Sequence, residues 1–226
     1  IALLVRTLAD ALLAWGIKPF VVPAMGSHGG GTPEGQRETL ASLGITGETS
    51  GVPIRSAPDT VEIGSVSGGP AVFMDSNAAK ADMVIPVCRI KPHTGFRGPF
   101  ESGAVKMLVV GLGKQKGAAA IHGCGMENFA RNLEAAGRIV LGTGKVPFAV
   151  CVVENAYDQI ARVDVVPGEV IPAREPELLG EAKRLMGKLP VDDIDVLLVG
   201  EIGKEISGAG MDPNVTGRFS VPGLRG

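Results

Sequence analysis

Residues Arg89–Met126 read RIKPHTGFRGPFESGAVKMLVVGLGKQKGAAAIHGCGM, and two of the chain's three histidines lie in this segment. The segment follows the apolar, β-branched run Met83–Val87, which predicts a buried strand ending at Cys88. His93 then lies in a loop just beyond a strand end. In open α/β sheets ligands bind in the crevice at that end of the strands, so we expect a ligand site close to His93.

The second half of the segment combines a lysine, an apolar run and closely spaced glycines. Lys106 stands at the head of the run Met107–Val110, which leads into Gly111, Gly113 and Lys114 and then into a helix-permissive alanine stretch. The glycines depart by one position from the dinucleotide fingerprint and lack the Walker A spacing. Two interpretations stay open, a strand-to-helix turn or a backbone cradle for a phosphate that Lys114 assists.

Outside this segment, helical and strand periodicities alternate along the chain, which predicts an α/β protein. We expect a mixed, mainly parallel sheet with flanking helices in a Rossmann-like domain over residues 1–190, and the beginning of a second α/β domain over residues 191–226. Residues 51–75 alternate apolar with polar side chains, as in short antiparallel strands. Helices are expected at Ile1–Trp15, Pro33–Leu43, Asn77–Lys80, Glu127–Arg138 and Pro176–Lys188, and strands at Phe20–Val22, Phe148–Val153, Gln159–Val166 and Ile194–Gly200.

The composition excludes several classes of function. Hydrophobic residues make up 45% of the 226 residues and the net charge is −2, which argues against nucleic-acid binding and against an anionic membrane surface. No apolar run reaches the roughly 18 residues that a membrane span needs. The three cysteines are widely spaced and form no CxxC pair, so a reducing, cytoplasmic environment is expected. The 33 glycines suit loops that approach a small ligand with their backbone.

Each candidate side chain also has an ordinary interpretation. A single loop histidine is more often solvated or structural than catalytic, but His28, His93 and His122 all lie in glycine-rich surroundings. Lys106 is either a surface charge or an amine at the edge of a low-dielectric site, where its pKa falls and it becomes nucleophilic. Glu101 is interpreted as a solvated loop acid. The alternative is that Glu101 orients a histidine through a hydrogen bond.

At these residues the sequence resembles the lactate racemase family, whose members use a nickel-pincer nucleotide. The family pattern has a histidine, a glycine-rich loop, a lysine that carries the cofactor covalently and, sixteen residues later, a histidine that ligates nickel. His93, Lys106 and His122 match these positions. Val21–His28 matches an upstream strand, small-residue turn and histidine. The loop between His93 and Lys106 is longer than in well-known members, which indicates a distinct branch.

The resemblance implies an isomerase, a racemase or epimerase of a small 2-hydroxy carboxylic acid. It implies that His28 and His93 exchange protons on the two faces of a keto-acid intermediate, that Lys106 carries the nickel-pincer nucleotide, and that His122 binds the nickel. Imidazole suits nickel, and a histidine pKa near 6.5 suits proton transfer at neutral pH. The implied partners are the substrate and cofactor-maturation proteins, and the oligomeric state is not indicated.

Two departures from the family pattern affect these expectations. The glutamine and lysine of the family's second domain align with Gly203–Ser220, where the glutamine position is Gly217. We expect a substrate other than plain lactate, with the substitute for these two residues among Lys204, Asp212, Asn214 and Arg218. The family's nucleotide-binding arginine and aspartate would precede Ile1, and both ends of the chain look cut, so we expect a fragment.

Two other functions remain open at this point. One is a zinc-dependent hydrolase that uses His28, His93 and His122 as ligands and keeps a fourth position open for water. It requires the three imidazoles to lie together. The other is a non-catalytic module that binds a phosphate ligand on the glycine-rich loops.

Overall fold

Two small sheets and their surrounding helices make up the computed structural model of the protein, which describes residues 1–191, 193–203 and 210–219. One sheet has the order β3-β4-β5, formed by Val87–Arg89, Phe148–Glu154 and Ile160–Pro167. The other is a hairpin of β1, Thr60–Ser65, and β2, Ala71–Asp75. The predicted mixed α/β class is confirmed.

Parallel pairing is less extensive than the sequence predicts. β3 and β4 are parallel, with Cys88 opposite Cys151, and they are the one parallel pair among the strands of the described residues. β4 and β5 form an antiparallel pair, as do β1 and β2, and the latter pair confirms the antiparallel strands predicted within residues 51–75. Phe20–Val22 is not a full strand, because it contributes only an isolated bridge between Val21 and Ile54.

The helices overlap the predicted ranges, but the helix predicted at Pro176–Lys188 begins five residues earlier, at Ile171. Thr32 begins α2 because its hydroxyl accepts a hydrogen bond from the Gly35 N–H, and Pro33 occupies the first helical position. The α-helices are α1 Ala2–Ala14, α2 Pro33–Ser42, α3 Gly47–Ser50, α4 Ser76–Lys80, α5 Ala104–Lys106, α6 Lys114–His122, α7 Met126–Gly142, α8 Ile171–Leu185 and α9 Pro213–Thr216. The remaining helical turns are η1 Gly29–Gly31, η2 Met107–Gly111 and η3 Gly168–Val170.

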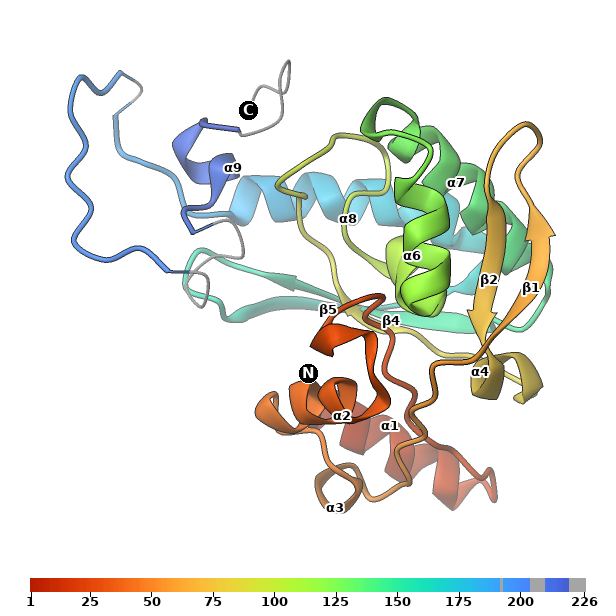
Figure 1. Ribbon diagram of the computed structural model, residues 1–226. Helices are drawn as coiled ribbons and strands as arrows, with labels where there is room; N and C mark the ends of the chain where they lie inside the picture. The colour runs from red at the N-terminus through yellow and green to blue at the C-terminus, as the bar shows by residue number, and fades with distance from the viewer. Residues whose placement is uncertain (192, 204–209, 220–226) are drawn as a thin grey trace.

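The elements are arranged in layers around the three-stranded sheet. α8 packs along β4 and β5, and α1, α2 and α3 lie on the opposite side of these strands (Figure 1). α6 and α7 stand beside the β1–β2 hairpin, where α6 packs on β2 and α7 on β1. α9 follows an extended segment and contacts the loop after β3, where Asn214 accepts a hydrogen bond from Arg97.

Three further segments that the sequence analysis treated as strands also need correction. The strand predicted at Met83–Val87 begins only at Val87. Met107–Val110 lies in the π-helix η2, in which the Leu112 N–H donates to the Met107 carbonyl over 2.8 Å, so the turn that follows joins two helices. Four apolar residues do not distinguish a strand from a buried helix, and packing decided between them. Ile194–Gly200 forms no strand in the described chain, and its Leu198 is 91% exposed.

The core is centred on η2 and the inner face of α7. The fully buried Phe129, Leu133, Ala136 and Val140 recur with the spacing of one helical face. Gly137 lies on the same helix where a Cβ would come within 2.7 Å of the Val105 side chain, so glycine permits the close approach of α5. Truncating a residue such as Leu133 to alanine is expected to cost about 2–5 kcal/mol. This packing fixes the helices that carry the candidate site.

The helices of the described chain are too short or too polar to cross a lipid bilayer.

Candidate functional site

His93 lies in the loop after β3, and two backbone contacts fix its position. Its own N–H donates to Glu101 Oε2 over 2.8 Å, and its ring Nδ1 accepts a hydrogen bond from the Gly95 N–H at 2.9 Å. Since Nδ1 is the acceptor, the neutral ring carries its proton on Nε2. Burial lowers the pKa of His93 to about 3, and the charge of Lys106 is the next cause. His93 is therefore a neutral side chain at pH 7.

Glu101 is buried, and its interpretation as a solvated loop acid is wrong. Its side chain is inaccessible to solvent and accepts the Lys183 ammonium at 2.7 Å on Oε1. Oε2 accepts the His93 N–H and an Arg97 guanidinium N–H at 3.3 Å. Burial of a carboxylate is tolerated because both oxygens have charged or N–H donors. Glu101 thus orients the His93 loop, as the alternative interpretation expected, but it does so through the backbone N–H of His93 and not through the ring.

Lys106 occupies the last residue of α5, where the chain passes into the π-helix η2. Burial lowers the pKa of Lys106 from its usual 10.5 to about 8, and the positive charge of Lys91 contributes as the second cause. Its ammonium lies 5.8 Å from the centre of the Phe96 ring. A half-buried lysine with this pKa has a substantial fraction of free amine at neutral to mildly alkaline pH, as a nucleophilic lysine requires.

His122 is the last residue of α6, and its ring is exposed with a defined orientation. Nδ1 lies 2.7 Å from the Ala118 carbonyl oxygen, four residues earlier in the same helix. Because a carbonyl can only accept, Nδ1 carries the proton and the lone pair of Nε2 is free. A backbone carbonyl that holds one ring nitrogen is the usual arrangement behind a metal-binding histidine.

A row of rings brings these side chains into one place. The ring centres of His93 and Phe96 are 4.5 Å apart, those of Phe96 and Phe129 4.5 Å, and those of Phe129 and His122 4.8 Å. The Lys106 ammonium lies over the face of the Phe96 ring. We call His93, Lys106 and His122 the site cluster. The structure thus gathers three side chains that are far apart in sequence around Phe96 and Phe129.

His28, the remaining candidate histidine, is not joined to the site cluster. Its ring is exposed, and the described residues give it no ring contact with His93 or His122. The loop is held by α2, since Gln36 Nε2 donates to the Gly26 carbonyl at 2.9 Å. Gly31 of this loop faces Gln115 at the start of α6, whereas His122 ends that helix. At 1.5 Å per residue, these two positions are about 10 Å apart along the helix axis.

Lys114 has a structural role, which corrects its assignment as a phosphate ligand. It is only 2% exposed, and its ammonium donates to the Pro23 carbonyl at 2.6 Å and to Gln36 Oε1 at 3.0 Å. Its third neighbour is Asp75 Oδ2 at 3.2 Å, an ion pair without hydrogen-bond geometry. The ammonium therefore joins the Pro23 turn, α2 and β2.

Gly111 and Gly113 are explained by close packing of the chain. A Cβ on Gly111 would lie 2.5 Å from the Ala24 carbonyl oxygen, and one on Gly113 would lie 2.4 Å from the Val109 carbonyl oxygen. Real side chains do not approach backbone oxygens this closely, so both positions require glycine for internal reasons. The turn interpretation accounts for both glycines. The hypothesis of a phosphate-binding module required Lys114 as a phosphate ligand, and Lys114 has a structural role.

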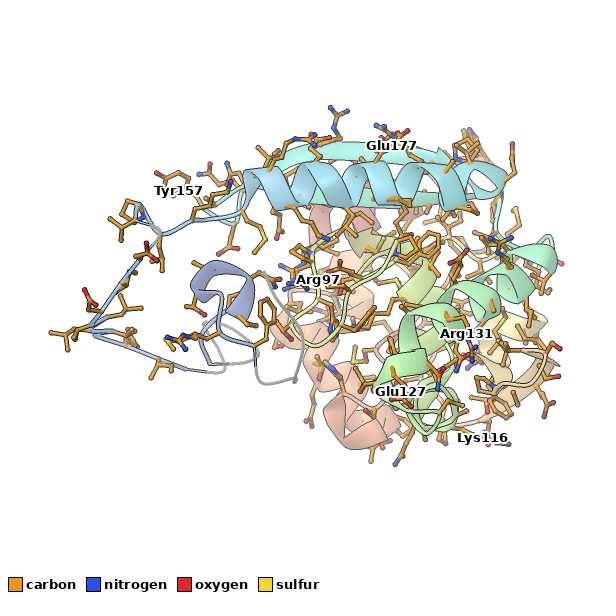
Figure 2. All side chains as sticks on the ribbon, turned by 90° about the horizontal axis from the view of Figure 1, so that it is seen from above. Arg97, Lys116, Glu127, Arg131, Tyr157 and Glu177 are labelled. Carbon is orange, nitrogen blue, oxygen red and sulfur yellow. The ribbon has the colours of Figure 1, made fainter. Side chains whose placement is uncertain are left out.

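Arg97 is a site residue that the sequence analysis missed. Its guanidinium donates to the His93 carbonyl at 2.6 Å and to Asn214 Oδ1 at 2.6 Å, and it lies beside α9 (Figure 2). Asn214 is one of the predicted substitutes, and it reaches the His93 loop through this contact. Asp212 Oδ1 begins α9 by accepting the Asn214 N–H. Lys204, another predicted substitute, lies outside the described residues.

The described residues contain no group of three or more histidine, cysteine, aspartate or glutamate side chains that could hold a metal ion. A zinc site made of His28, His93 and His122 is therefore not formed, and the hydrolase interpretation is wrong on geometry. A cofactor that brings its own donor atoms needs fewer protein ligands. His122 can supply one of them.

A comparison with known protein families finds no match, and a comparison with curated proteins finds none either. Among solved structures, the chain is similar to the lactate racemase apoprotein from Thermoanaerobacterium thermosaccharolyticum, with 18% identity and a TM-score of 0.55. The match covers 76% of this chain and 44% of that racemase, so the chain spans less than half of that protein's length. At this identity the likeness shows a shared fold.

Proposed function

We propose that this chain is the cofactor-binding part of a racemase or epimerase that acts on a small 2-hydroxy carboxylic acid. The observation that carries the proposal is the site cluster, in which a lysine of lowered pKa and two oriented imidazoles meet around Phe96 and Phe129. The fold likeness to a lactate racemase supports it. The proposed cofactor is a nickel-pincer nucleotide, installed with the help of cofactor-maturation proteins.

The donor set of the site cluster fits this cofactor. The Lys106 amine, with its pKa lowered to about 8 by burial, suits a covalent bond to an acyl group of the nucleotide. His122 offers the Nε2 lone pair as a single nickel ligand, while Ala118 holds the other ring nitrogen. When bound, the cofactor would supply the electron sink that takes the hydrogen of the substrate carbon as hydride.

The charges of the site favour an anionic substrate. Lys91 and Arg97 each act on His93 as positive charges, and the buried carboxylate of Glu101 is already occupied by Lys183 and Arg97. A covalent bond at Lys106 would remove one cation and leave Lys91 and Arg97. We assign these two residues the attraction of the substrate carboxylate and of the cofactor's phosphate, since opposite charge in a partly buried site is weakly screened.

His93 would hold the substrate oxygen and exchange its proton. With Gly95 bonded to Nδ1, the ring presents Nε2–H and donates a hydrogen bond to that oxygen. To accept the hydroxyl proton on Nε2, the ring must give up the Gly95 contact and move its proton to Nδ1. Loss of the Lys106 charge and binding of a carboxylate both raise the pKa of His93 from about 3 toward its ordinary value. The base is thus activated when the site is loaded.

Inversion needs a second proton acceptor, and His28 is our candidate. Its ring is exposed, and its loop lies against the start of α6, the helix that ends at His122. We expect His28→Ala to slow loss of optical activity by about 10²–10⁴-fold, the usual contribution of a general acid–base group. Cofactor attachment at Lys106 should be unchanged in this variant, which separates catalysis from loading.

The test is production of the protein together with cofactor-maturation enzymes, followed by mass spectrometry, nickel analysis and an optical assay with single enantiomers of several 2-hydroxy acids. We expect an adduct on Lys106, stoichiometric nickel and racemisation of at least one acid. Lys106→Met should lose all three, and His122→Ala should lose nickel while it retains the adduct. Lys116→Met is the matched control, because Lys116 is an exposed lysine of α6 (Figure 2). Full racemisation by Lys106→Met would rule the proposal out.

A further inference from the structure

Helix α8 contacts the C-terminal half of the site segment His93–Lys106, at Glu101 and at Val105. Lys183 of α8 binds Glu101 Oε1 at 2.7 Å, and Glu101 in turn accepts the His93 N–H. Glu175 of α8 accepts the Val105 N–H at 3.0 Å, directly before Lys106. Lys183 follows Glu175 by eight residues, about two helical turns, so both side chains lie on the same face. Neither side chain belongs to the site cluster itself.

Glu175 supplies a helix cap that α5 lacks in its own sequence. α5 begins after Gly103, which has no side chain to accept the first N–H groups of the helix. Glu175 Oε2 accepts a hydrogen bond from the Val105 N–H, and the backbone of Ala104 also lowers the pKa of this carboxyl group. A carboxylate at a helix N-terminus satisfies donors that have no partner within the helix and interacts favourably with the helix dipole. The start of the helix that carries Lys106 is thus fixed from another element.

The fit around this carboxyl group is close. Glu175 is 2% exposed, and Oε1 has no hydrogen-bond partner in the described structure. A Cβ on Gly103 would lie 2.3 Å from Glu175 Oε1 and 2.6 Å from Ile90 Cδ1. The glycine is therefore required so that the carboxyl group can reach the backbone. A buried carboxylate with one unpaired oxygen is costly to keep, which points to a role beyond stability.

We propose that Glu175 is a positioning residue for Lys106: its carboxyl group holds the first turn of α5 and keeps the amine half-buried beside Phe96. The role goes beyond the proposed reaction, because it concerns the reactivity of the lysine in the cofactor-free protein. Glu175 acts through the backbone of Ala104 and Val105 and touches no reacting group. An experiment can therefore contradict the positioning role of Glu175 without contradicting the racemase proposal, and the reverse also holds.

The experiment measures the acylation rate of each lysine with acetic anhydride at pH 8, by peptide mass spectrometry of the purified protein. An amine with a pKa of about 8 is about half free at this pH, against about 0.3% for an amine at 10.5. We expect Glu175→Ala to expose Lys106 to water and slow its acylation about tenfold or more. Glu175→Gln keeps an acceptor oxygen and should stay within about twofold of the wild-type rate.

Two further variants make the test specific. Glu177→Ala is the matched control, because Glu177 projects from the same helix into solvent (Figure 2) and its partner among the described residues is Arg174, so the rate at Lys106 should not change. Gly103→Ala places a methyl group against Glu175 Oε1 and should slow acylation of Lys106 as Glu175→Ala does. This variant provides the same test if Glu175→Ala does not fold. An unchanged rate at Lys106 in folded Glu175→Ala or Gly103→Ala overturns the proposal. Equal slowing in Glu175→Gln also overturns it.

Discussion

Replacement of Lys114 by methionine should destabilise the protein strongly. The substitution removes an ammonium that is 2% exposed and faces three oxygens, of Pro23, Gln36 and Asp75, at 2.6–3.2 Å. Asp75 is fully buried and would be left without its cationic partner. Breaking a buried pair by removing one partner typically costs about 3–5 kcal/mol. For a domain of this size that corresponds to a fall in Tm of about 6–20 °C.

The assay is urea and thermal unfolding followed by circular dichroism. The matched control is Lys116→Met, two residues along α6, whose exposed ammonium lies 4.4 Å from the Phe73 ring centre and should contribute about 0.5–1 kcal/mol. The double variant Asp75→Asn with Lys114→Met should recover part of the loss, because it removes the stranded charge. A loss below about 1 kcal/mol in Lys114→Met would refute the structural role and return Lys114 to the phosphate-ligand interpretation.

Three further predictions concern charge and pH. Burial raises the pKa of Glu175 to about 7, so the contribution of this group to stability is present below pH 4.5 and is lost as pH rises through 7. In urea unfolding, the free energy of unfolding of Glu175→Gln relative to wild type should therefore rise by about 3 kcal/mol between pH 4.5 and pH 7. Burial lowers the pKa of His93 to about 3, so stability should fall as pH drops from 6.5 toward 3, and His93→Gln should flatten that decline in the same assay. The charge of Lys91 helps to lower the pKa of Lys106, so Lys91→Met should shift the midpoint of the Lys106 acylation profile to higher pH, while an unchanged midpoint would contradict this charge effect.

Sequence periodicity was sufficient to predict the elements that are long enough to show a helical or strand period of their own. The face of α7 could be predicted, because Phe129, Leu133 and Ala136 recur at helical spacing. The hairpin of β4 and β5 follows from two apolar runs joined by a polar turn at residues 155–159. The run Met107–Val110 could not be assigned, because its burial among α6 and α7 decides its conformation and four residues carry no period of their own.

The candidate site was predicted in part, for a similar reason. The resemblance singled out His93, Lys106 and His122, and the fold brings these three together. The buried carboxylates of Glu101 and Glu175 were not predictable as site supports. Their roles depend on contacts between segments far apart in the chain, and a glutamate in a loop or on a helix usually faces water.

The most direct test of the central claim is an NMR titration of the His93 imidazole in wild type and in Lys106→Met, with Lys116→Met as the control. Burial and the neighbouring charge of Lys106 place the pKa of His93 at about 3 in wild type. Loss of that charge should raise the pKa measurably in Lys106→Met and leave it unchanged in Lys116→Met. A His93 pKa near 6.5 that is identical in all three proteins would contradict the convergence of these side chains in one site.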